Sequence, residues 1–166
     1  PILLADGDDF AAPLAAADLI VSSPGMKPES LLYRAARATN KPLIGEMEFG
    51  FRNWPGKVLA ITGTDGKTTT TELTCHLLCA VGVKAVPAGN IGLPLCDTAA
   101  DLLDGKIPFT SLPVIEVSSF QLELVETFSP FAAALLNVAN DHQDRYPGGM
   151  AEYECVKRRI FRGVPP

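Results

Sequence analysis

The chain has 166 residues, enough for one sizeable hydrophobic core or for one domain with part of another. It is 47% hydrophobic and 20% charged, which is typical of an ordinary α/β protein and excludes a disordered chain. The formal net charge of −5 argues against a nucleic-acid partner, and no apolar run is long enough to span a membrane.

The four cysteines indicate a reducing compartment, so we expect the protein in the cytoplasm. Cys75 and Cys79 lie one helical turn apart and could share a metal, but no second Cys/His pair has zinc-site spacing. We therefore interpret the cysteines as buried reduced thiols. The Pro1–Leu4 run is too short for a signal peptide and lacks a basic flank. Because the sequence starts without Met and ends at Pro166, we expect a fragment of a longer protein.

Strand-like apolar runs alternate with helical patterns along the chain. In chain order, we expect a helix at 11–17, a strand at 18–22, a helix at 28–38, a strand at 41–45, a helix at 46–54, a strand at 57–62, a helix at 67–80, a strand at 83–86, a helix at 94–103, strands at 112–117 and 132–138, and a helix at 149–161. In the helix at 67–80, the apolar residues at helical spacing are Leu73, Leu77 and Leu78. The alternation predicts an α/β fold, with a mostly parallel sheet covered by helices on both faces.

The strongest functional signal is the segment 57–70, where a buried strand leads into a glycine-bracketed loop and a helix start. The loop reads Gly63-Thr64-Asp65-Gly66-Lys67-Thr68. Loop N–H groups and a helix N-terminus attract phosphate, Lys67 can reach terminal phosphates, and the Thr68 hydroxyl can hold Mg²⁺. Ile61 stands where a strict Walker A motif has its first glycine, so the loop is a shortened form. The alternative is an ordinary strand–turn–helix with a chance glycine pair and lysine.

Further polar residues follow the other strands, where parallel sheets bind ligands. Glu116 ends an apolar strand, and a buried carboxylate needs a cation, either Mg²⁺ or a nearby Lys or Arg. Gly89–Gly92 is a second glycine-bracketed loop, a weak signal alone, and we interpret His76 as structural or exposed. His142, in position to ligate a metal or contact substrate, belongs to a polar cluster after the strand at 132–138: Asn137, Asn140, Asp141, His142, Asp144 and Arg145.

Taken together, these residues resemble the Mur ligases, and most closely the branch of that family that adds D-glutamate. The matching blocks are residues 63–68 (GTDGKT), 89–92 (GNIG), 116–123 (EVSSFQLE), 137–138 (NV) and 141–147 (DHQDRYP). The turn at 22–25 (SSPG) also resembles the turn of the family's uridine-binding domain. The resemblance covers nearly the whole chain. One departure is Asp65, where the family more often has Asn.

The resemblance implies an ATP- and Mg²⁺-dependent amide ligase of peptidoglycan precursor synthesis, with UDP-N-acetylmuramoyl-L-alanine and D-glutamate as substrates. It implies catalytic roles for Lys67, His142 and Lys157. It implies that Thr68 and Glu116 hold a first metal, that Glu116 and His142 bind a second, and that CO₂ carbamylates Lys157 beside that second metal. The alternative for Lys157 is a plain surface lysine. The implied nucleotide-binding residues are Gly63, Thr64, Asp65, Gly66, Lys67, Thr68 and Thr69; the implied substrate-binding residues are Ser23, Gly25, Asn90, Ser118 and Gln121.

The resemblance also divides the chain. Residues 1–45 match the C-terminal part of a Rossmann-like uridine-nucleotide-binding domain, and residues 46–166 the N-terminal part of the central ATP-binding domain. We expect the C-terminal domain to be missing from this chain, so that the chain makes no product alone, and we expect the protein to be a monomer. The alternatives are another Mur-type amide ligase, such as the L-alanine-adding or folylpolyglutamate synthase-like branches, or a nucleotide-binding module without turnover.

Overall fold

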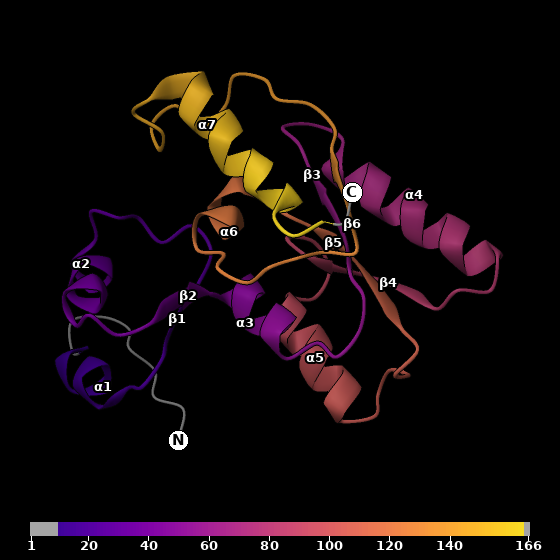
Figure 1. The fold of residues 1–166 in the computed structure, drawn as a ribbon, viewed down its shortest axis with the longest axis horizontal. Helices are drawn as coiled ribbons and strands as arrows, with labels where there is room; N and C mark the ends of the chain where they lie inside the picture. Colours follow the sequence, from indigo (N-terminus) through magenta and orange to yellow (C-terminus); the bar gives the residue numbers. More distant parts are fainter. Residues whose placement is uncertain (1–9, 165–166) are drawn as a thin grey trace.

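The computed structural model describes residues 10–164, so the Pro1–Leu4 run lies outside the described residues (Figure 1). The helices are α1 (Ala11–Ala16), α2 (Leu31–Ala38), α3 (Glu46–Arg52), α4 (Lys67–Ala80), α5 (Leu95–Leu103), α6 (Ser119–Glu123), α7 (Gly149–Arg158) and the 3-10 helix η1 (Arg159–Phe161). The strands are β1 (Ile20–Ser22), β2 (Leu43–Gly45), β3 (Leu59–Thr62), β4 (Ala85–Gly89), β5 (Leu112–Glu116) and β6 (Ala132–Leu135). This architecture confirms the predicted α/β class.

The strands form two parallel sheets, a two-stranded β1-β2 sheet and a four-stranded sheet in the order β4-β5-β3-β6. In the larger sheet, Glu116 at the end of β5 pairs with Ile61 of β3 on one side and with Gly89 of β4 on the other. Thr62 at the end of β3 pairs with Leu135 at the end of β6. All four carboxyl ends therefore meet at one edge, where ligands of such sheets bind.

Helices cover the larger sheet on both faces, as predicted (Figure 1). Ala60 and Ile115 belong to the core formed with α3, α5 and α7, whereas Ile61 and Val114 pack with residues of α4. Successive strand side chains point to opposite faces, so a sheet buried on both sides needs continuous apolar runs. This explains why the strands read as unbroken apolar segments in the sequence.

The helix α4 spans the predicted residues, but the side chains that it buries are mostly not the leucines that the sequence pattern pointed to. Leu73 and Leu77 are 54% and 57% exposed, and Thr71, Cys75 and Leu78 occupy the side that meets the sheet. Thr71 and Cys75 are small enough to let the helix approach the sheet closely. Neither α4 nor any other helix within residues 10–164 is long and apolar enough to cross a bilayer.

Several element ends differ from the predictions. The helix expected from residue 28 begins at Leu31, because the Ser30 side chain accepts the N–H of Tyr33 and caps it there. The strand expected at 83–86 is β4, Ala85–Gly89, which contains Pro87; proline is tolerated because β4 lies at the edge of the sheet. The strands β5 and β6 and the helix α7 end earlier than predicted, with η1 continuing from α7.

The cysteines are free thiols within the described residues, but only Cys75 is buried, and Cys79 and Cys155 are exposed. Burial raises the pKa of the Cys75 thiol to about 11. The expectation of uniformly buried thiols was therefore wrong. Cys75 and Cys79 lie one turn apart on α4, but only Cys75 is buried in the core between this helix and the sheet.

The carboxylate of Glu48 in α3 is fully buried and organises the chain segment that follows α6. It accepts the backbone N–H groups of Glu126, Thr127 and Phe128 at 2.9–3.1 Å, the Thr127 hydroxyl, and the Arg52 Nε at 2.8 Å. Burial alone raises the pKa of Glu48, but these hydrogen bonds outweigh it, and the net pKa lies below the ordinary value of 4.5.

We expect Glu48→Gln to destabilise the fold by about 3 kcal/mol, because an amide cannot accept all these donors and leaves some unpaired. Since the folded pKa is depressed, the contribution of Glu48 is present above pH 4.5 and is lost as the pH falls through the folded pKa. Denaturant unfolding of wild type and variant at pH 7 and pH 3 checks this. The exposed Glu154, paired with Arg158 on α7, provides the control Glu154→Gln, and an equal loss in the two variants would contradict the prediction.

Candidate functional site

The glycine-bracketed loop at residues 63–68, named the phosphate loop after its predicted role, joins the end of β3 to the start of α4. Gly66 caps the helix with φ of 77°, a conformation that favours glycine. Because α4 begins at Lys67, the N–H groups of its first turn lack partners within the helix and are directed at the loop. Lys67 Nζ donates to the Thr64 carbonyl at 2.7 Å. The loop thus has the donors and the cation of an anion site.

Asn137, directly after β6, fixes the shape of this loop. Its Oδ1 accepts the N–H groups of Thr64 and Asp65 at 3.0 and 2.9 Å, and its Nδ2 donates to the Asp65 carbonyl at 3.0 Å. The backbone N–H of Thr64 also donates to the Asn137 carbonyl at 3.2 Å. One side chain therefore holds the main chain of the loop on its outer side.

Glu116 is 2% exposed and lies beside the loop. Thr68 Oγ1 donates to its Oε2 at 2.6 Å, and Asn90 Nδ2 donates to its Oε1 at 2.7 Å. Within the described residues no Lys or Arg pairs with this carboxylate, so the salt-bridge alternative was wrong. Because the hydrogen-bond partners of this buried carboxylate are neutral, a cation bound beside the phosphate loop could pair with it.

Lys157 on α7 is 1% exposed, so the alternative of a plain surface lysine was wrong. Its Nζ donates to the Gly63 carbonyl at 2.7 Å and lies 4.7 Å from the centre of the Tyr153 ring. Burial, together with the nearby charge of Lys67, lowers the pKa of Lys157 to about 8. Near neutral pH the amine is therefore neutral in a larger fraction of molecules than an ordinary lysine, although the charged form still predominates.

His142 lies in the loop after β6 with φ of 51°, an uncommon conformation for a residue other than glycine. Its ring packs against Phe120, with the ring centres 4.8 Å apart, and its Nε2 is 3.4 Å from Asp141 Oδ2. The side chain is 40% exposed. The imidazole is therefore accessible to solvent, and its contacts with Phe120 and Asp141 fix its orientation.

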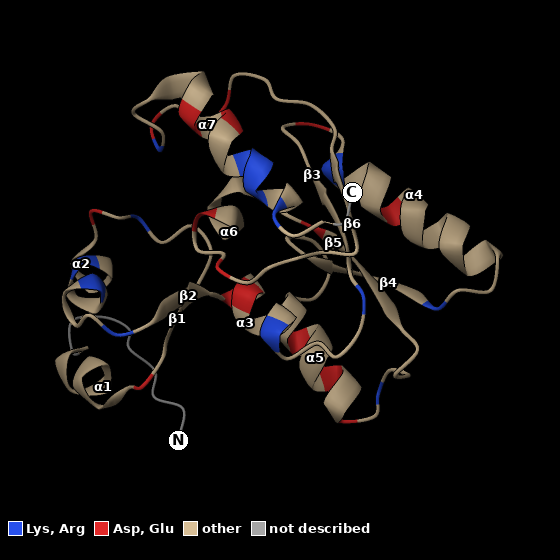
Figure 2. Ribbon diagram, in the orientation of Figure 1, with Lys and Arg blue, Asp and Glu red and all other residues tan. Residues whose placement is uncertain are grey.

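A cavity of about 240 Å³ brings several predicted site residues together beside the phosphate loop. It is lined by Lys67, Asn90, Ser118, Ser119, Phe120, His142, Tyr153 and Lys157. In Figure 2, basic residues lie at the start of α4 and on the C-terminal half of α7, and acidic residues lie at the start of α7. Two lysines from separate helices thus face one cavity, an arrangement suited to a multiply charged anion.

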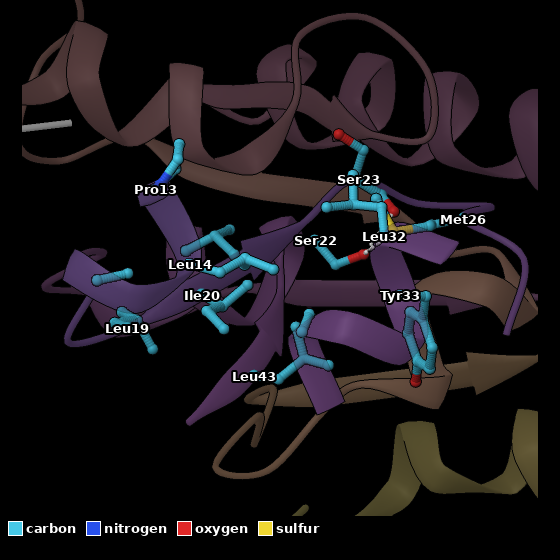
Figure 3. Close-up of a pocket in the computed structure, with 13 residues that line it drawn as sticks. Pro13, Leu14, Leu19, Ile20, Ser22, Ser23, Met26, Leu32, Tyr33 and Leu43 are labelled. Carbon is cyan, nitrogen blue, oxygen red and sulfur yellow. Dashed lines mark hydrogen bonds between the residues drawn. The ribbon is translucent and has the colours of Figure 1, made fainter. Parts of the chain in front are cut away.

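The predicted residues Ser23 and Gly25 lie outside this cavity, in the exposed turn after β1. Ser23 borders a cavity of about 220 Å³ whose other walls are mostly apolar side chains of α1, β1 and α2 (Figure 3). Ser23 and Gly25 also line a narrow crevice shared with Phe120 and Arg145. Phe120 lines both this crevice and the cavity beside the phosphate loop.

Gln121 is buried and takes part in capping α6. Its Oε1 accepts the N–H of Ser118 at 2.9 Å, and its own N–H donates to the Ser118 side chain at 3.3 Å. This pair is a capping box, which orients Ser118 toward the neighbouring cavity. Gln121 contributes to the site through this cap.

The prediction missed Tyr153, Phe120 and Ser119 as residues of the cavity wall. Tyr153 lies four residues before Lys157 on the same helix, and that spacing places two residues on one helix face. The helical pattern at 149–161 could therefore have identified Tyr153. Within residues 10–164, no group of three or more His, Cys, Asp or Glu side chains is arranged to hold a metal.

Residues 61–166 match the family described as Mur ligase middle domain. The chain is 43% identical to UDP-N-acetylmuramoylalanine--D-glutamate ligase from Aromatoleum aromaticum, over 95% of the chain and 35% of that protein. It is 42% identical to the enzyme of the same name from Shigella sonnei, over 91% of the chain and 33% of that protein. The chain thus spans about a third of the length of these curated relatives.

Two solved structures share the fold at low sequence identity. The first is a UDP-N-acetylmuramate:L-alanyl-gamma-D-glutamyl-meso-diaminopimelate ligase from Neisseria meningitides, with a TM-score of 0.57 and 21% identity over 93% of the chain and 52% of that protein. The second is MurF ligase from Thermotoga maritima in complex with ADP, with a TM-score of 0.51 and 17% identity over 91% of the chain and 42% of that protein. The match of residues 61–166 to the family model shows that the chain belongs to the Mur ligase family.

Proposed function

We propose that the chain is part of an ATP-dependent ligase that joins D-glutamate to UDP-N-acetylmuramoyl-L-alanine in peptidoglycan synthesis. The observation that carries the proposal is the cavity in which Lys67, Asn90, His142 and Lys157 meet beside the phosphate loop. The names of relatives more than 40% identical to the chain support the choice of D-glutamate. The expected setting is a monomeric enzyme in the cytoplasm, without nucleic-acid or membrane partners.

We assign residues 1–45 to the end of a uridine-nucleotide-binding domain and residues 46–166 to the start of the ATP-binding domain. The division into a β1-β2 sheet and a separate four-stranded sheet supports this boundary. In this assignment, Ser23 and Gly25 contact the uridine diphosphate, and Asn90, Ser118 and Gln121 serve the muramoyl-alanine portion, Gln121 through its cap on Ser118.

The phosphate loop would bind ATP through residues 63–69. The N–H groups at the start of α4 would donate to the phosphates, and Lys67 Nζ, now 2.7 Å from the Thr64 carbonyl, would turn from that carbonyl to pair with them. The substrate carboxylate would attack the γ-phosphorus as the bond to ADP breaks. The D-glutamate amine would then attack the resulting acyl phosphate, releasing phosphate and a proton as the amide forms.

The residues around Glu116 fit Mg²⁺, because this buried carboxylate has only neutral hydrogen-bond partners, one of them the Thr68 hydroxyl. Thr68 and Glu116 would hold one ion, and Glu116, His142 and a carbamylated Lys157 a second. Bound Mg²⁺ neutralises charge on the phosphoryl group. His142 and Lys157 line the cavity from two separate segments, and there they would help to fix the position of the substrate carboxylate.

Carbamylation of Lys157 predicts a signal that can be observed without turnover. Only the neutral amine adds to CO₂, releasing a proton, so the carbamate should increase as the pH rises from 7 through about 8 and reach a plateau above it. Carbon-13 NMR of the full-length protein in labelled bicarbonate checks this. Lys157→Arg should abolish the signal, whereas loss of the exposed Lys84 by Lys84→Arg should not; a signal unchanged in Lys157→Arg would contradict the assignment.

Amino-acid preference in the full-length protein tests the proposed function. Phosphate release from ATP should require UDP-N-acetylmuramoyl-L-alanine and D-glutamate together. If the protein instead adds L-alanine to a precursor that lacks this residue, or adds glutamate to a folate, it belongs to another branch of the family. ATP binding without release of phosphate under any of these conditions would indicate a nucleotide-binding module. We expect the 166-residue chain alone to make no product.

A further inference from the structure

Arg145 joins three segments that are far apart in the sequence. Its Nε and Nη2 donate to the Glu123 carboxylate of α6 at 3.0 and 2.6 Å. Its Nη1 donates to the Met26 carbonyl, 119 residues away, at 2.9 Å. Its guanidinium also lies 5.2 Å from the centre of the Phe120 ring. The Arg145 and Glu123 side chains are only 12% and 20% exposed.

Each of these segments carries or adjoins a residue to which the proposed function gives a role in substrate binding. Met26 directly follows the Ser22–Gly25 turn, and Glu123 ends the helix α6 that begins beside Ser118. Arg145 itself belongs to the turn of His142, because its N–H donates to the His142 carbonyl at 2.9 Å. The guanidinium therefore lies where the turn after β1, the helix α6 and the His142 loop meet.

The contacts of Arg145 with Glu123 and the Met26 carbonyl form a joint between these segments. Two further hydrogen bonds to Glu123 make this joint rigid. Tyr146, 3% exposed, donates its hydroxyl to Glu123 Oε1 at 2.9 Å, and Arg159 Nη1 donates to the Glu123 carbonyl at 2.9 Å. A fork-shaped guanidinium can donate to a carboxylate and a carbonyl at the same time, whereas an ammonium is a single point charge. Lysine cannot replace these contacts.

We propose that Arg145, acting through Glu123 and the Met26 carbonyl, is a positioning residue that sets the Ser22–Gly25 turn relative to the His142 loop. This inference rests on the proposed function, in which one substrate spans both segments. The nucleotide end of that substrate would lie at the turn, and its reacting carboxylate would lie near His142. The crevice lined by Ser23, Gly25, Phe120 and Arg145 adjoins the cavity of the phosphate loop through Phe120. Misplacement of one end by about 1 Å can reduce the rate about 100-fold.

Arg145→Lys in the full-length protein tests this role. We expect kcat/KM for UDP-N-acetylmuramoyl-L-alanine to fall about 100-fold. The KM for ATP should stay within about twofold, because within residues 10–164 no hydrogen bond or ion pair of the Arg145 or Glu123 side chain reaches the phosphate loop. Glu123→Gln should have a similar effect, and the double variant should be little worse than either single one. The matched control is Arg158→Lys, which alters an exposed Arg158–Glu154 pair on α7 and should leave all constants unchanged.

Two kinetic results would overturn the inference. One is unchanged kinetics in Arg145→Lys; the other is an equal loss of affinity for ATP and the nucleotide-sugar together with a lower Tm, which indicates a general loss of structure. If wild type makes no product with D-glutamate, the proposed function fails separately. Calorimetric binding of UDP-N-acetylmuramoyl-L-alanine without amino acid then decides: weaker binding in Arg145→Lys than in Arg158→Lys supports the joint, and equal binding refutes it.

Discussion

Lys67→Ala should lower kcat of the full-length enzyme about 10³-fold, the largest loss we expect from a single side chain. Lys67 supplies the positive charge at the phosphate loop, and it lines the cavity that it shares with Asn90, His142 and Lys157. The charge that develops on the transferring phosphoryl group would lose its partner on the protein. Initial rates of phosphate release at saturating ATP measure the effect.

The control for this prediction is Lys84→Ala, which removes an exposed lysine just before β4. It should retain full activity. Wild-type turnover in Lys67→Ala would show that the glycine-bracketed loop is not the phosphate site. Because Lys67 also lowers the pKa of Lys157, the carbamate signal of Lys67→Ala should appear at higher pH than in wild type.

Gly89→Ala should be the most disruptive small substitution, costing about 3–5 kcal/mol of folding free energy. Gly89 has φ of 95°, and a Cβ there would lie only 2.4 Å from the Glu116 carbonyl oxygen. The strand β4 would have to move away from β5 next to Asn90, whose N–H donates to that carbonyl at 2.9 Å. Asn90 would then no longer be held against the Glu116 carboxylate, so activity should fall with stability.

Gly82→Ala separates the two causes of this cost. Gly82 has φ of 87°, but a Cβ there would meet no atom within 4 Å. It therefore carries the backbone strain without the steric clash, and urea unfolding should show a loss of about 1–3 kcal/mol. Equal losses in the two variants would mean that the contact between Gly89 and Glu116 is unimportant.

The elements that the sequence predicted well are those with unambiguous local signals. The start of α4 at Lys67 could be predicted because Gly66, which adopts a left-handed conformation, separates the helix from the strand before it. The burial of Glu116 follows from the apolar run that it ends. The helix α6 was missed because five residues show no periodicity, although Ser118 followed three residues later by Gln121 is a capping signature.

Other features depend on tertiary contacts that no local pattern encodes. Lys157 precedes two arginines, a sequence typical of a solvated helix end, yet it is buried against the Gly63 carbonyl. The contact between Arg145 and Met26 spans 119 residues of sequence. The exposure of Leu73 and Leu77 also ran against their apolar character, because close packing of α4 on the sheet favours the smaller Thr71 and Cys75.

The hydrogen bonds between Asn137 and the phosphate loop bear on which side chains residue 65 can carry. Asn137 bonds only the main-chain N–H and carbonyl of Asp65, and the Asp65 carboxylate takes part in none of the ion pairs formed within residues 10–164. The loop geometry is therefore indifferent to the side chain at this position. An Asp65→Asn substitution should therefore leave the hydrogen bonds between Asn137 and the main chain of the loop intact.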